Sequence, residues 1–339
     1  MSIPYRTRRV LGRLAVTLLV IALVLAVIWL CWVLWLGRFV VYTADGAKFD
    51  FSQSSDQMNG APAEPPETES LISIHYNEGD DAIALGTELT QMNGYYILPD
   101  DLKQGIPQLR NQLTNLAAGT AVLVDVKNIY GEFFYDSSVS TARSSSVDTQ
   151  QMGQLIDHLT KSNLYAIARV PAFQDYTYGL NHVDDGLFST EGAFLWWDDQ
   201  GCYWLNPTRE GTISYLVQIA TELKQLGFDE VVFDAFWFPY SDGYVFQGDR
   251  YQALTTAANT LVTTCATDTF AVSFIGDSTF PLPEGRCRLY MRDVDASAAA
   301  GIAQSVTLPD PVIHLVFLTD VHDTRFDVYS VLRPISSVR

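Results

Sequence analysis

Basic side chains are scarce in this chain of 339 residues, which has 21 Lys and Arg against 39 Asp and Glu. The net charge of −18 argues against nonspecific nucleic-acid binding, because such binding needs basic patches that follow the phosphates. Cysteine is scarce as well, with four residues, of which Cys31 lies in an apolar run. The other three, Cys202, Cys265 and Cys287, include no CxxC pair and are an odd number, so they indicate neither a complete disulfide framework nor a zinc site. We expect buried thiols, with at most one bridge among them.

Motifs that define several enzyme classes are also missing. The sequence has no HExxH and no GxSxG, and its five histidines lack the spacing of metal ligands, which argues against metalloproteases and serine hydrolases. No glycine-rich loop follows a strand-like segment, so a dinucleotide-binding fold is disfavoured. We therefore expect neither a metal nor a cofactor.

One long apolar run is present. Residues 15–36 read AVTLLVIALVLAVIWLCWVLWL, without charge, Pro or Gly, and about 20 helical residues cross a hydrocarbon core of about 30 Å. Four arginines and no acid precede the run, which places the N-terminus in the cytoplasm. The alternative is a cleaved signal peptide, whose apolar region would be about 7–15 residues long and end at a small-residue site. We predict a retained single-pass anchor in the cell membrane, with the C-terminal domain outside the cell.

The chain divides into four parts. We predict a cytoplasmic basic tail (residues 1–14), a transmembrane helix (15–36), a short hairpin with a Pro-, Ser- and Glu-rich linker (37–70) and one folded domain (71–339). The hairpin is expected at 40–51, where β-branched and aromatic residues flank an Asp45-Gly46 turn. The linker has almost nothing to bury, which is typical of a flexible stalk.

From Leu71 onward, short apolar segments alternate with amphipathic ones. Near-continuous apolar strands suit a parallel sheet that is buried on both faces. Eight strands over about 240 residues predict an α/β fold, a (β/α)8 barrel, in preference to a doubly wound open sheet. The expected strands are 94–98, 121–127, 165–171, 230–236, 270–275, 288–291, 312–318 and 326–332. The expected helices are 102–117, 148–162, 207–226, 250–265 and 296–305.

Polar residues follow these strands, where a barrel of this kind forms its active site. Converging carboxylates suit glycosidic-bond hydrolysis, in which one carboxyl group protonates the leaving oxygen and another attacks or activates water. We predict Asp234, after the fourth strand, as nucleophile or stabiliser, because an acid at the end of an apolar run needs a functional reason. Asp277 or Asp320, after the fifth and seventh strands, is the predicted acid/base. The predicted sugar-orienting residues are Asp125, Lys127 and Arg169, and Asp293 is a further residue expected to bind substrate.

Each of these assignments has a structural alternative. An ion pair with Lys127 or Arg169 would explain Asp125 equally well, and solvated loops would explain Asp277 and Asp320. Aromatic residues crowd the segment 173–206 and the end of the fourth strand, and aromatic faces stack on sugar rings. We predict Trp196, Trp204 and Trp237 as stacking platforms. For any single ring, packing of the loop against the barrel is the alternative.

Four stretches resemble one family. They are VLVDVKNIYGEFFYDS (122–137), LYAIARVPAFQD (164–175), LWWDDQGCYWLNPTREG (195–211) and LGFDEVVFDAFWFP (226–239). Their order is similar to that in the domain of unknown function 4015, a TIM-barrel group of bacterial exported proteins described as a putative glycosyl hydrolase domain. The resemblance covers about residues 40–339 and implies a carbohydrate-active barrel. The matching positions are Asp125, Lys127, Gly131, Tyr135, Ser137, Arg169, Phe173, Asp175, Trp204, Pro207, Asp234 and Pro239, and the match adds Asp175 to the residues expected to bind substrate.

The chain departs from the family pattern at four positions. Asn128 replaces an acid, Gln174 replaces a lysine, and Ala235 and Trp237 replace a tyrosine and an arginine. The loss of a cation from the rim would change the charge preference for substrate or abolish activity.

These observations predict a membrane-anchored, outward-facing glycoside hydrolase that acts on an extracellular or cell-envelope glycan. Its partners would be a glycan or cell-wall polysaccharide and the membrane, and not nucleic acid. Two alternatives stay open, since a fold alone does not define an activity. One is a barrel that binds carbohydrate or peptidoglycan without cutting it, and the other is an anchored scaffold for the envelope.

Overall fold

The computed structural model describes residues 40–43, 46–49 and 88–337 of the chain, which divides into two units, 1–80 and 81–339. In the first unit, β1 (Val40–Thr43) pairs antiparallel with β2 (Gly46–Phe49), which confirms the predicted hairpin. The predicted membrane helix at 15–36 and most of the predicted stalk lie outside the described residues. Within the described ranges, no helix has the length and apolarity needed to cross a bilayer.

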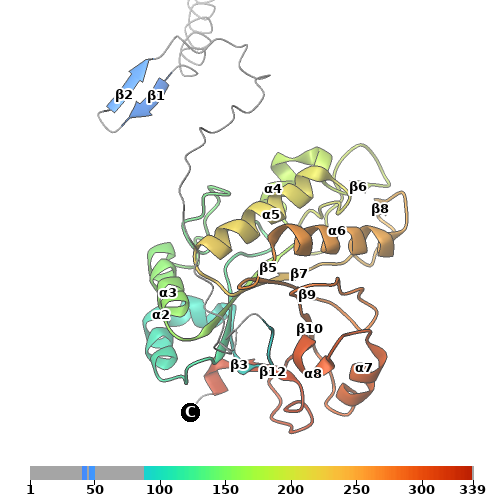
Figure 1. Ribbon diagram of the computed structural model, residues 1–339. Coiled ribbons are helices and arrows are strands. Elements are labelled where there is room, and N and C mark those ends of the chain that lie inside the picture. The colour runs from blue at the N-terminus through green and yellow to red at the C-terminus, as the bar shows by residue number, and fades with distance from the viewer. Residues whose placement is uncertain (1–39, 44–45, 50–87, 338–339) are drawn as a thin grey trace, which may run out of the picture. The chain divides into compact units, whose positions relative to one another are not determined.

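The second unit contains a closed barrel of eight parallel strands in chain order, as predicted (Figure 1). Closure rules out the open-sheet alternative, because every strand pairs with two neighbours. The strands are β3 (Asn93–Ile97), β4 (Ala121–Asp125), β5 (Tyr165–Pro171), β7 (Glu230–Asp234), β9 (Ala271–Ile275), β10 (Leu289–Arg292), β11 (Leu315–Leu318) and β12 (Ser330–Pro334).

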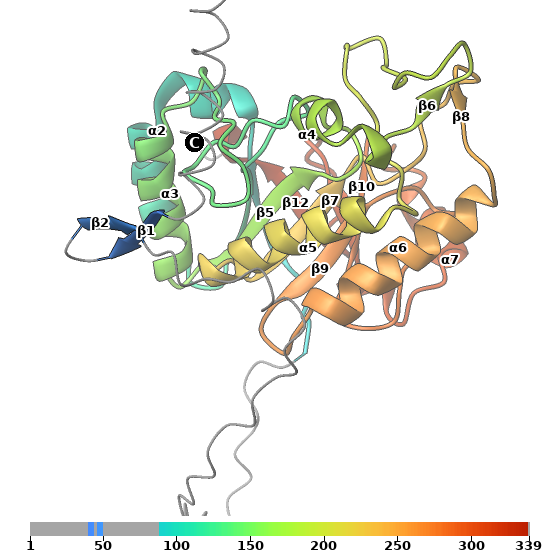
Figure 2. The same ribbon diagram turned by 90° about the horizontal axis from the view of Figure 1, so that it is seen from above.

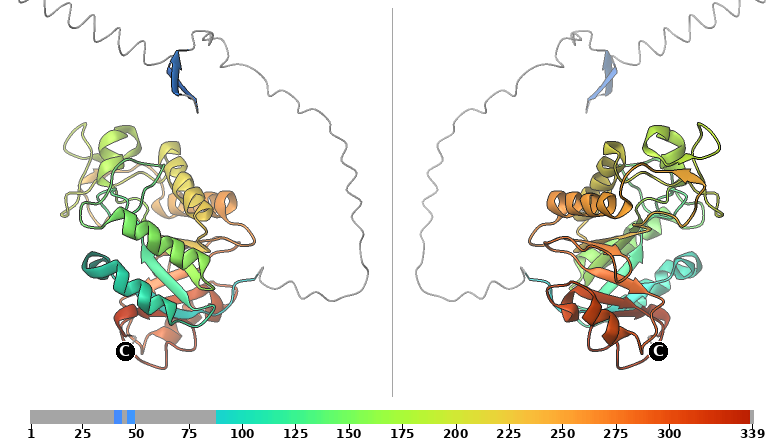
Figure 3. Two further views of the ribbon diagram at one scale, coloured as in Figure 1. Left: turned by 90° about the vertical axis from the view of Figure 1, so that its left-hand side faces the viewer. Right: turned by 90° about the vertical axis from the view of Figure 1, so that its right-hand side faces the viewer.

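Helices cover the outside of the barrel unevenly. In the views of Figures 2 and 3, α2 lies beside α3 on one flank and α5 lies beside α6 on another. The connections from β9 to β10 and from β11 to β12, which the structure describes in full, contain no helix. The helices are α2 (Pro99–Thr114), α3 (Thr149–Lys161), α4 (Tyr176–Asn181), α5 (Glu210–Gln225), α6 (Arg250–Cys265), α7 (Ala299–Ser305) and α8 (Pro311–His314). Short 3-10 turns occupy Val183–Asp185 and Ile335–Ser337, and β6 (Phe188–Ser189) pairs with β8 (Tyr244–Val245) above the barrel.

Two predicted strand boundaries are wrong for a local reason. The strand expected from residue 312 begins only at Leu315, because Pro311 opens α8 and the Asp310 side chain accepts a hydrogen bond from the Val312 backbone N–H. Proline fixes the first helical φ, and aspartate is a favoured N-cap. The strand expected from residue 326 likewise begins only at Ser330, after a run of turns.

The three cysteines of the barrel unit are buried free thiols. Burial raises the pKa of Cys202 and Cys287 to about 12 and that of Cys265 to about 11. Thiols with such values are unreactive at neutral pH, which agrees with the expected packing role.

Inside the barrel, side chains sort into layers because every second residue of a strand points inward. The middle layer is apolar except for the Tyr290 hydroxyl, and its inward residues are Leu123, Ile167, Val232, Ile275, Tyr290, Val316 and Leu332. On four of these strands, the inward position two residues before the apolar layer holds a polar side chain. These residues are Tyr165, Glu230, Ser273 and Ser330, and all are buried or half-buried. On four strands, the inward position two residues after the apolar layer holds a charged side chain, and these residues are Asp125, Arg169, Asp234 and Arg292. The apolar layer therefore separates a polar floor from a charged mouth.

The polar floor is built around Glu230. Its carboxylate pairs with Arg288, whose Nη1 lies 2.5 Å from Oε2, and it accepts hydrogen bonds from the hydroxyls of Tyr165 and Tyr290 at 2.9 Å each. The Glu230 and Arg288 side chains are no more than 2% exposed. A charge at this depth is tolerated only because its partners surround it.

Removal of the arginine tests this interpretation. We expect Arg288→Met to lower the free energy of unfolding by about 3–5 kcal/mol, because it leaves the Glu230 carboxylate buried without a cation. Chemical denaturation of the purified chain measures the change. The double variant Glu230→Gln/Arg288→Met should recover part of the loss, and a single variant within about 1 kcal/mol of wild type would contradict the account.

Candidate active site

The charged mouth begins with an ion pair between neighbouring strands. Asp125 at the end of β4 is the register partner of Arg169 on β5. The Arg169 Nε and Nη2 donate to the two Asp125 carboxylate oxygens at 2.5 and 2.8 Å. This two-point contact fixes the planes of both groups. The alternative considered for Asp125, an ion pair with Arg169, is thus present, and both side chains also line a cleft of about 440 Å³.

The second ion pair joins strands that are not adjacent. Asp234 ends β7, and its Oδ2 lies 3.1 Å from Nη1 of Arg292, which ends β10. The other oxygen, Oδ1, accepts the backbone N–H of Ala235 at 2.7 Å. The Arg292 side chain is 42% exposed, and its guanidinium lies 5.7 Å from the centre of the Trp237 ring. Asp234 is therefore held by donors on both oxygens while it faces the mouth.

The backbone is unusual directly after each member of this pair. Ala235 has φ 49° and Asp293 has φ 58°, and these are the two non-glycine residues with positive φ in the described part of the chain. Left-handed backbone at a non-glycine residue costs of order 1–3 kcal/mol and concentrates at functional sites. The strain coincides with the sharp turns that present Asp234 and Arg292.

The mouth contains two adjacent cavities. The cleft of about 440 Å³ is lined by Asp234 together with Asp125, Arg169 and residues of the loop after β4, among them Asn128, Tyr130 and Glu132. A smaller cavity of about 280 Å³ is lined by Arg292, Trp237 and Asp277. The Asp234–Arg292 pair therefore lies where the two cavities meet, and together they match the size of a small-molecule site.

The pKa of Tyr96 on β3 is influenced by charged residues on the opposite side of the mouth. Burial raises the pKa of its hydroxyl, the carboxylates of Asp320 and Asp293 raise it further, and Arg169 opposes them. Asp320 and Asp293 therefore lie close enough to Tyr96 to act on it, although both are exposed. Asp277 is exposed as well, and its Oδ1 accepts the N–H and hydroxyl of Thr279 at 2.7 and 2.6 Å.

Lys127 and Asp175, predicted to bind substrate, form a buried ion pair instead of an open contact surface. The Lys127 Nζ lies 2.7 Å from Asp175 Oδ2, and both side chains are 0% exposed. Asp175 also accepts the Tyr215 hydroxyl at 2.9 Å and, through Oδ1, the backbone N–H of Tyr178 at 2.8 Å. The pair holds the loops after β4 and β5 against α5. It therefore stabilises the loops that surround the mouth.

The three predicted tryptophans lie in different environments. Trp204 is 5% exposed, and its indole N–H donates to Asp198 at 2.7 Å. Trp196 is half-buried against Tyr244, with ring centres 5.3 Å apart. Trp237 is half-buried in the smaller cavity beneath Arg292. Of the three, Trp237 lies nearest the charged groups of the mouth.

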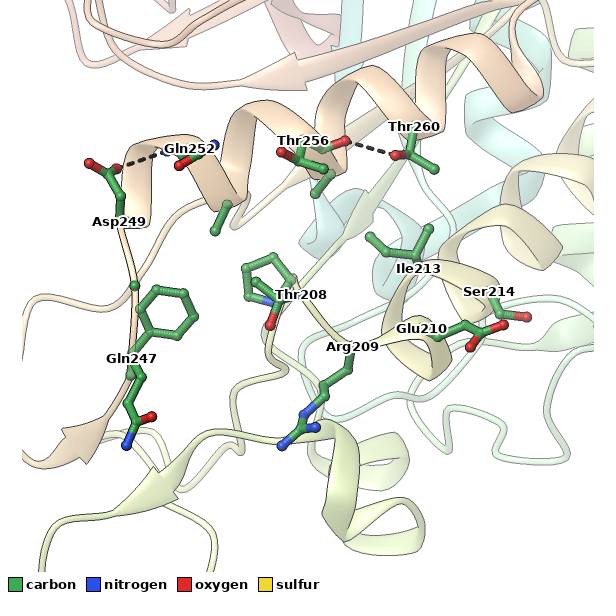
Figure 4. Close-up of a pocket in the computed structure, with 15 residues that line it drawn as sticks. Thr208, Arg209, Glu210, Ile213, Ser214, Gln247, Asp249, Gln252, Thr256 and Thr260 are labelled. Carbon is green, nitrogen blue, oxygen red and sulfur yellow. Dashed lines mark hydrogen bonds between the residues drawn. The ribbon is translucent and has the colours of Figure 1, made fainter.

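A third and larger cavity lies away from the mouth. It has a volume of about 630 Å³ and opens between the N-terminal turns of α5 and α6 (Figure 4). Its wall is largely apolar, and its Asp249 carboxylate caps α6 by accepting the Gln252 N–H at 2.9 Å. None of the residues predicted for the site lines it. Size alone therefore does not identify the site, because several of the residues predicted for it line the two smaller cavities of about 440 and 280 Å³.

Sequence reasoning missed three features of the mouth. None of Arg292 at the end of β10, Tyr96 on β3 and Glu132 in the loop after β4 was predicted as a site residue. The alternation of inward-facing positions along the strands could have identified Arg292 and Tyr96. Glu132 lies in a loop, seven residues beyond the end of β4, where this alternation gives no information. Among the residues that the structure describes, no three His, Cys, Asp or Glu side chains are grouped to hold a metal ion.

The loop after β4, which carries Glu132, is attached to α5 through Glu222. The Glu222 carboxylate accepts the hydroxyls of Tyr135 and Ser137 at 2.6 Å each and both the N–H and the hydroxyl of Ser138, at 2.5 and 2.7 Å. Burial would raise the pKa of Glu222, but these hydrogen bonds lower it below its usual value. The two family positions Tyr135 and Ser137 thus have a structural explanation.

The folded domain is thus a (β/α)8 barrel with paired carboxylates and cations at the carboxyl ends of its strands. Residues 105–270 match the family model described as "Putative glycosyl hydrolase domain", which is the family that the sequence motifs resemble. No curated protein matches the chain.

Solved structures with the same fold include glycosidases. The α-galactosidase of family GH36 from Geobacillus stearothermophilus, in complex with raffinose, aligns over 75% of this chain and 40% of its own, with 12% identity and a TM-score of 0.51. The galactosidase domain of an α-galactosidase–sucrose kinase aligns over 74% of this chain and 38% of its own, with 11% identity and a TM-score of 0.50. At these identities the likeness shows the shared barrel, and the chain spans about two-fifths of those proteins.

The Glu222 attachment gives a prediction with a definite pH dependence. Because the folded-state pKa of Glu222 is lowered, its stabilisation is present above the unfolded value, about 4.3 for glutamate, and is lost as the pH falls toward the folded value. We expect Glu222→Gln to lower the free energy of unfolding by about 1–2 kcal/mol at pH 7, since the site is half exposed. Urea unfolding at pH 7, 5 and 3 should show this difference shrinking at pH 3. A difference that stays constant with pH would contradict the assignment.

Proposed function

We propose that this protein is a glycoside hydrolase whose centre is Asp234. The single observation that carries the proposal is the position of this carboxylate at the end of β7, where it lines the larger mouth cavity and is held by the Ala235 N–H and by Arg292, which lines the smaller cavity. The family of residues 105–270 and the glycosidases that share the barrel support the same class of reaction.

The geometry suits one role for Asp234 better than the other. A carboxylate whose oxygens are fixed by a guanidinium and a backbone N–H is positioned to attack, or to stabilise charge at, the anomeric carbon. The reaction needs a second carboxyl group that carries a proton to the leaving oxygen. Asp277 and Asp320 are the candidates predicted from the sequence. A separation of about 5–5.5 Å between the two groups corresponds to retention of configuration, and about 6.5–9.5 Å to inversion.

Neighbouring residues would hold the sugar. The Asp125–Arg169 pair offers both donors and acceptors on the wall of the larger cleft. Trp237, covered by Arg292, offers an aromatic surface in the smaller cavity. A sugar chain that spans both cavities would place its scissile bond over the Asp234–Arg292 pair.

The location of the substrate rests on the sequence. We propose that residues 15–36 anchor the chain in the cell membrane and that the barrel faces outward, so the substrate is an extracellular or cell-envelope glycan. Protease treatment of intact cells tests this proposal: the barrel should be digested while the N-terminal tail is protected. Protection of the barrel would contradict it.

One observation favours a second function, binding without cleavage. In the structure, Arg292 occupies one oxygen of Asp234, and Arg169 occupies both oxygens of Asp125. If Arg292 does not move when a sugar enters, the mouth binds glycan but does not cut it. An anchored envelope scaffold has no comparable observation in its favour.

Reducing-end release separates the two functions. The wild-type chain should release reducing ends from at least one member of a panel of glycans and envelope fractions, and Asp234→Asn should reduce that release by more than about 1,000-fold. Asp242→Asn, an exposed residue on the same loop, is the matched control and should behave as wild type. Circular dichroism checks that each variant is folded.

Equal release by wild type and Asp234→Asn would remove Asp234 from the mechanism. No release by any form, together with glycan binding that survives Asp234→Asn, would show the binding function instead.

A further inference from the structure

We propose that Glu132 is the proton donor and acceptor that works with Asp234. The inference rests on the proposed hydrolase function and assigns a catalytic residue that the sequence did not indicate. Glu132 lies in the loop between β4 and α3, and it lines the same cleft of about 440 Å³ as Asp234. Two carboxyl groups on one cleft, on different elements, are what acid-assisted hydrolysis of a glycosidic bond requires.

The contacts of Glu132 differ from those of the other cleft carboxylates. Its Oε2 accepts the Asn128 side-chain amide at 2.8 Å, and no ion pair to it is found among the described residues. Asp125, by contrast, is paired with Arg169, and Asp234 with Arg292. A proton donor needs a carboxyl oxygen that can reach the leaving group: both oxygens of Asp125 and of Asp234 are engaged, whereas Glu132 Oε1 has no partner among the described residues. Glu132 is therefore the cleft carboxyl group suited to carry the proton.

The backbone around Glu132 is held in one conformation. The Asn128 Oδ1 accepts the N–H groups of Tyr130 and Glu132 at 3.0 Å each, and the Asn128 N–H donates to the Glu132 carbonyl at 3.1 Å. Gly131 has φ +78°, and a Cβ there would lie 2.3 Å from Asp175 Oδ1. Phe133 and Phe134, the next two residues, are buried. The turn is therefore fixed against the barrel, as a catalytic group requires.

The rival acids are less well placed. Asp277 lines the smaller cavity with Arg292, and its Oδ1 is engaged by Thr279. Asp320 and Asp293 are exposed, and neither lines the cleft that Asp234 lines. Asp175 is fully buried against Lys127. Asp277, Asp293 and Asp320 become outcomes of the test below.

The reaction balances with these two groups and water. Asp234 attacks the anomeric carbon while the protonated Glu132 gives its proton to the departing glycosidic oxygen, so the C–O bond breaks and a free hydroxyl leaves. The Glu132 carboxylate then takes a proton from water, whose oxygen attacks the same carbon and releases Asp234. Asp234 returns as a carboxylate and Glu132 as an acid, and the net change is the addition of one water.

Leaving-group dependence tests the role of Glu132. The full-length chain and its Glu132→Gln variant are assayed on the glycan that wild type cleaves in the release assay and on the 2,4-dinitrophenyl glycoside of the same sugar. Because dinitrophenolate departs without a proton, Glu132→Gln should lose about 100- to 10,000-fold in kcat/KM on the glycan but less than about 10-fold on the aryl glycoside. Azide should restore turnover of the variant and give a glycosyl azide. Glu210→Gln, an exposed residue outside the mouth, is the matched control.

Each outcome is decisive. Equal loss on both substrates means that Glu132 only supports the fold of the loop, and no loss on either removes it from the reaction. The same leaving-group pattern in Asp277→Asn, Asp293→Asn or Asp320→Asn, and not in Glu132→Gln, would transfer the role to that residue. These results overturn the inference while hydrolysis stands. Absence of release by wild type from every glycan overturns the proposed function and this inference together.

Discussion

Side chains two residues apart on a strand share a face of the sheet, and in a closed barrel the inner face is cut off from water along most of its length. This constraint sorts the charges of the protein. Below the apolar layer, Glu230 and Arg288 are buried and satisfy each other. Above it, Asp125, Arg169, Asp234 and Arg292 reach the cleft at the strand ends. The same alternation that builds the core therefore places these four charged side chains together at the mouth.

The Asp234–Arg292 pair gives the mouth its division into two cavities. Arg292 is partly exposed and covers Trp237, which stands where the family pattern has an arginine. A cation is thus present at the rim although it comes from a different strand. The Arg292 side chain is 42% exposed, so it has room to move toward solvent when a substrate approaches Asp234. This property makes the pair compatible with catalysis.

The sequence predicted the barrel because its evidence is local: apolar segments of strand length, helical periodicity between them and the absence of a phosphate loop. It missed the start of β11, where Asp310 and Pro311 begin a helical turn. Asp234 was foreseen because an acid at the end of an apolar run is costly without a purpose. Its pairing with Arg292 joins residues 58 positions apart, and the ion pair of Lys127 with Asp175 joins two loops. Such contacts exist only once the barrel has closed, so strand periodicity does not predict them. The position of Glu132 depends on a turn that Asn128 holds, and strand periodicity does not predict this turn either.

The central claim is that a glycan binds across the charged mouth with its scissile bond at Asp234. A crystal structure of the Asp234→Asn chain with an oligosaccharide that wild type cleaves would test this claim most directly. The account predicts sugar in both mouth cavities, the anomeric carbon beside residue 234, the leaving oxygen within hydrogen-bond distance of Glu132, and Arg292 displaced from its present position. Sugar bound instead between α5 and α6, or in the mouth with its glycosidic bonds remote from residue 234, would contradict it.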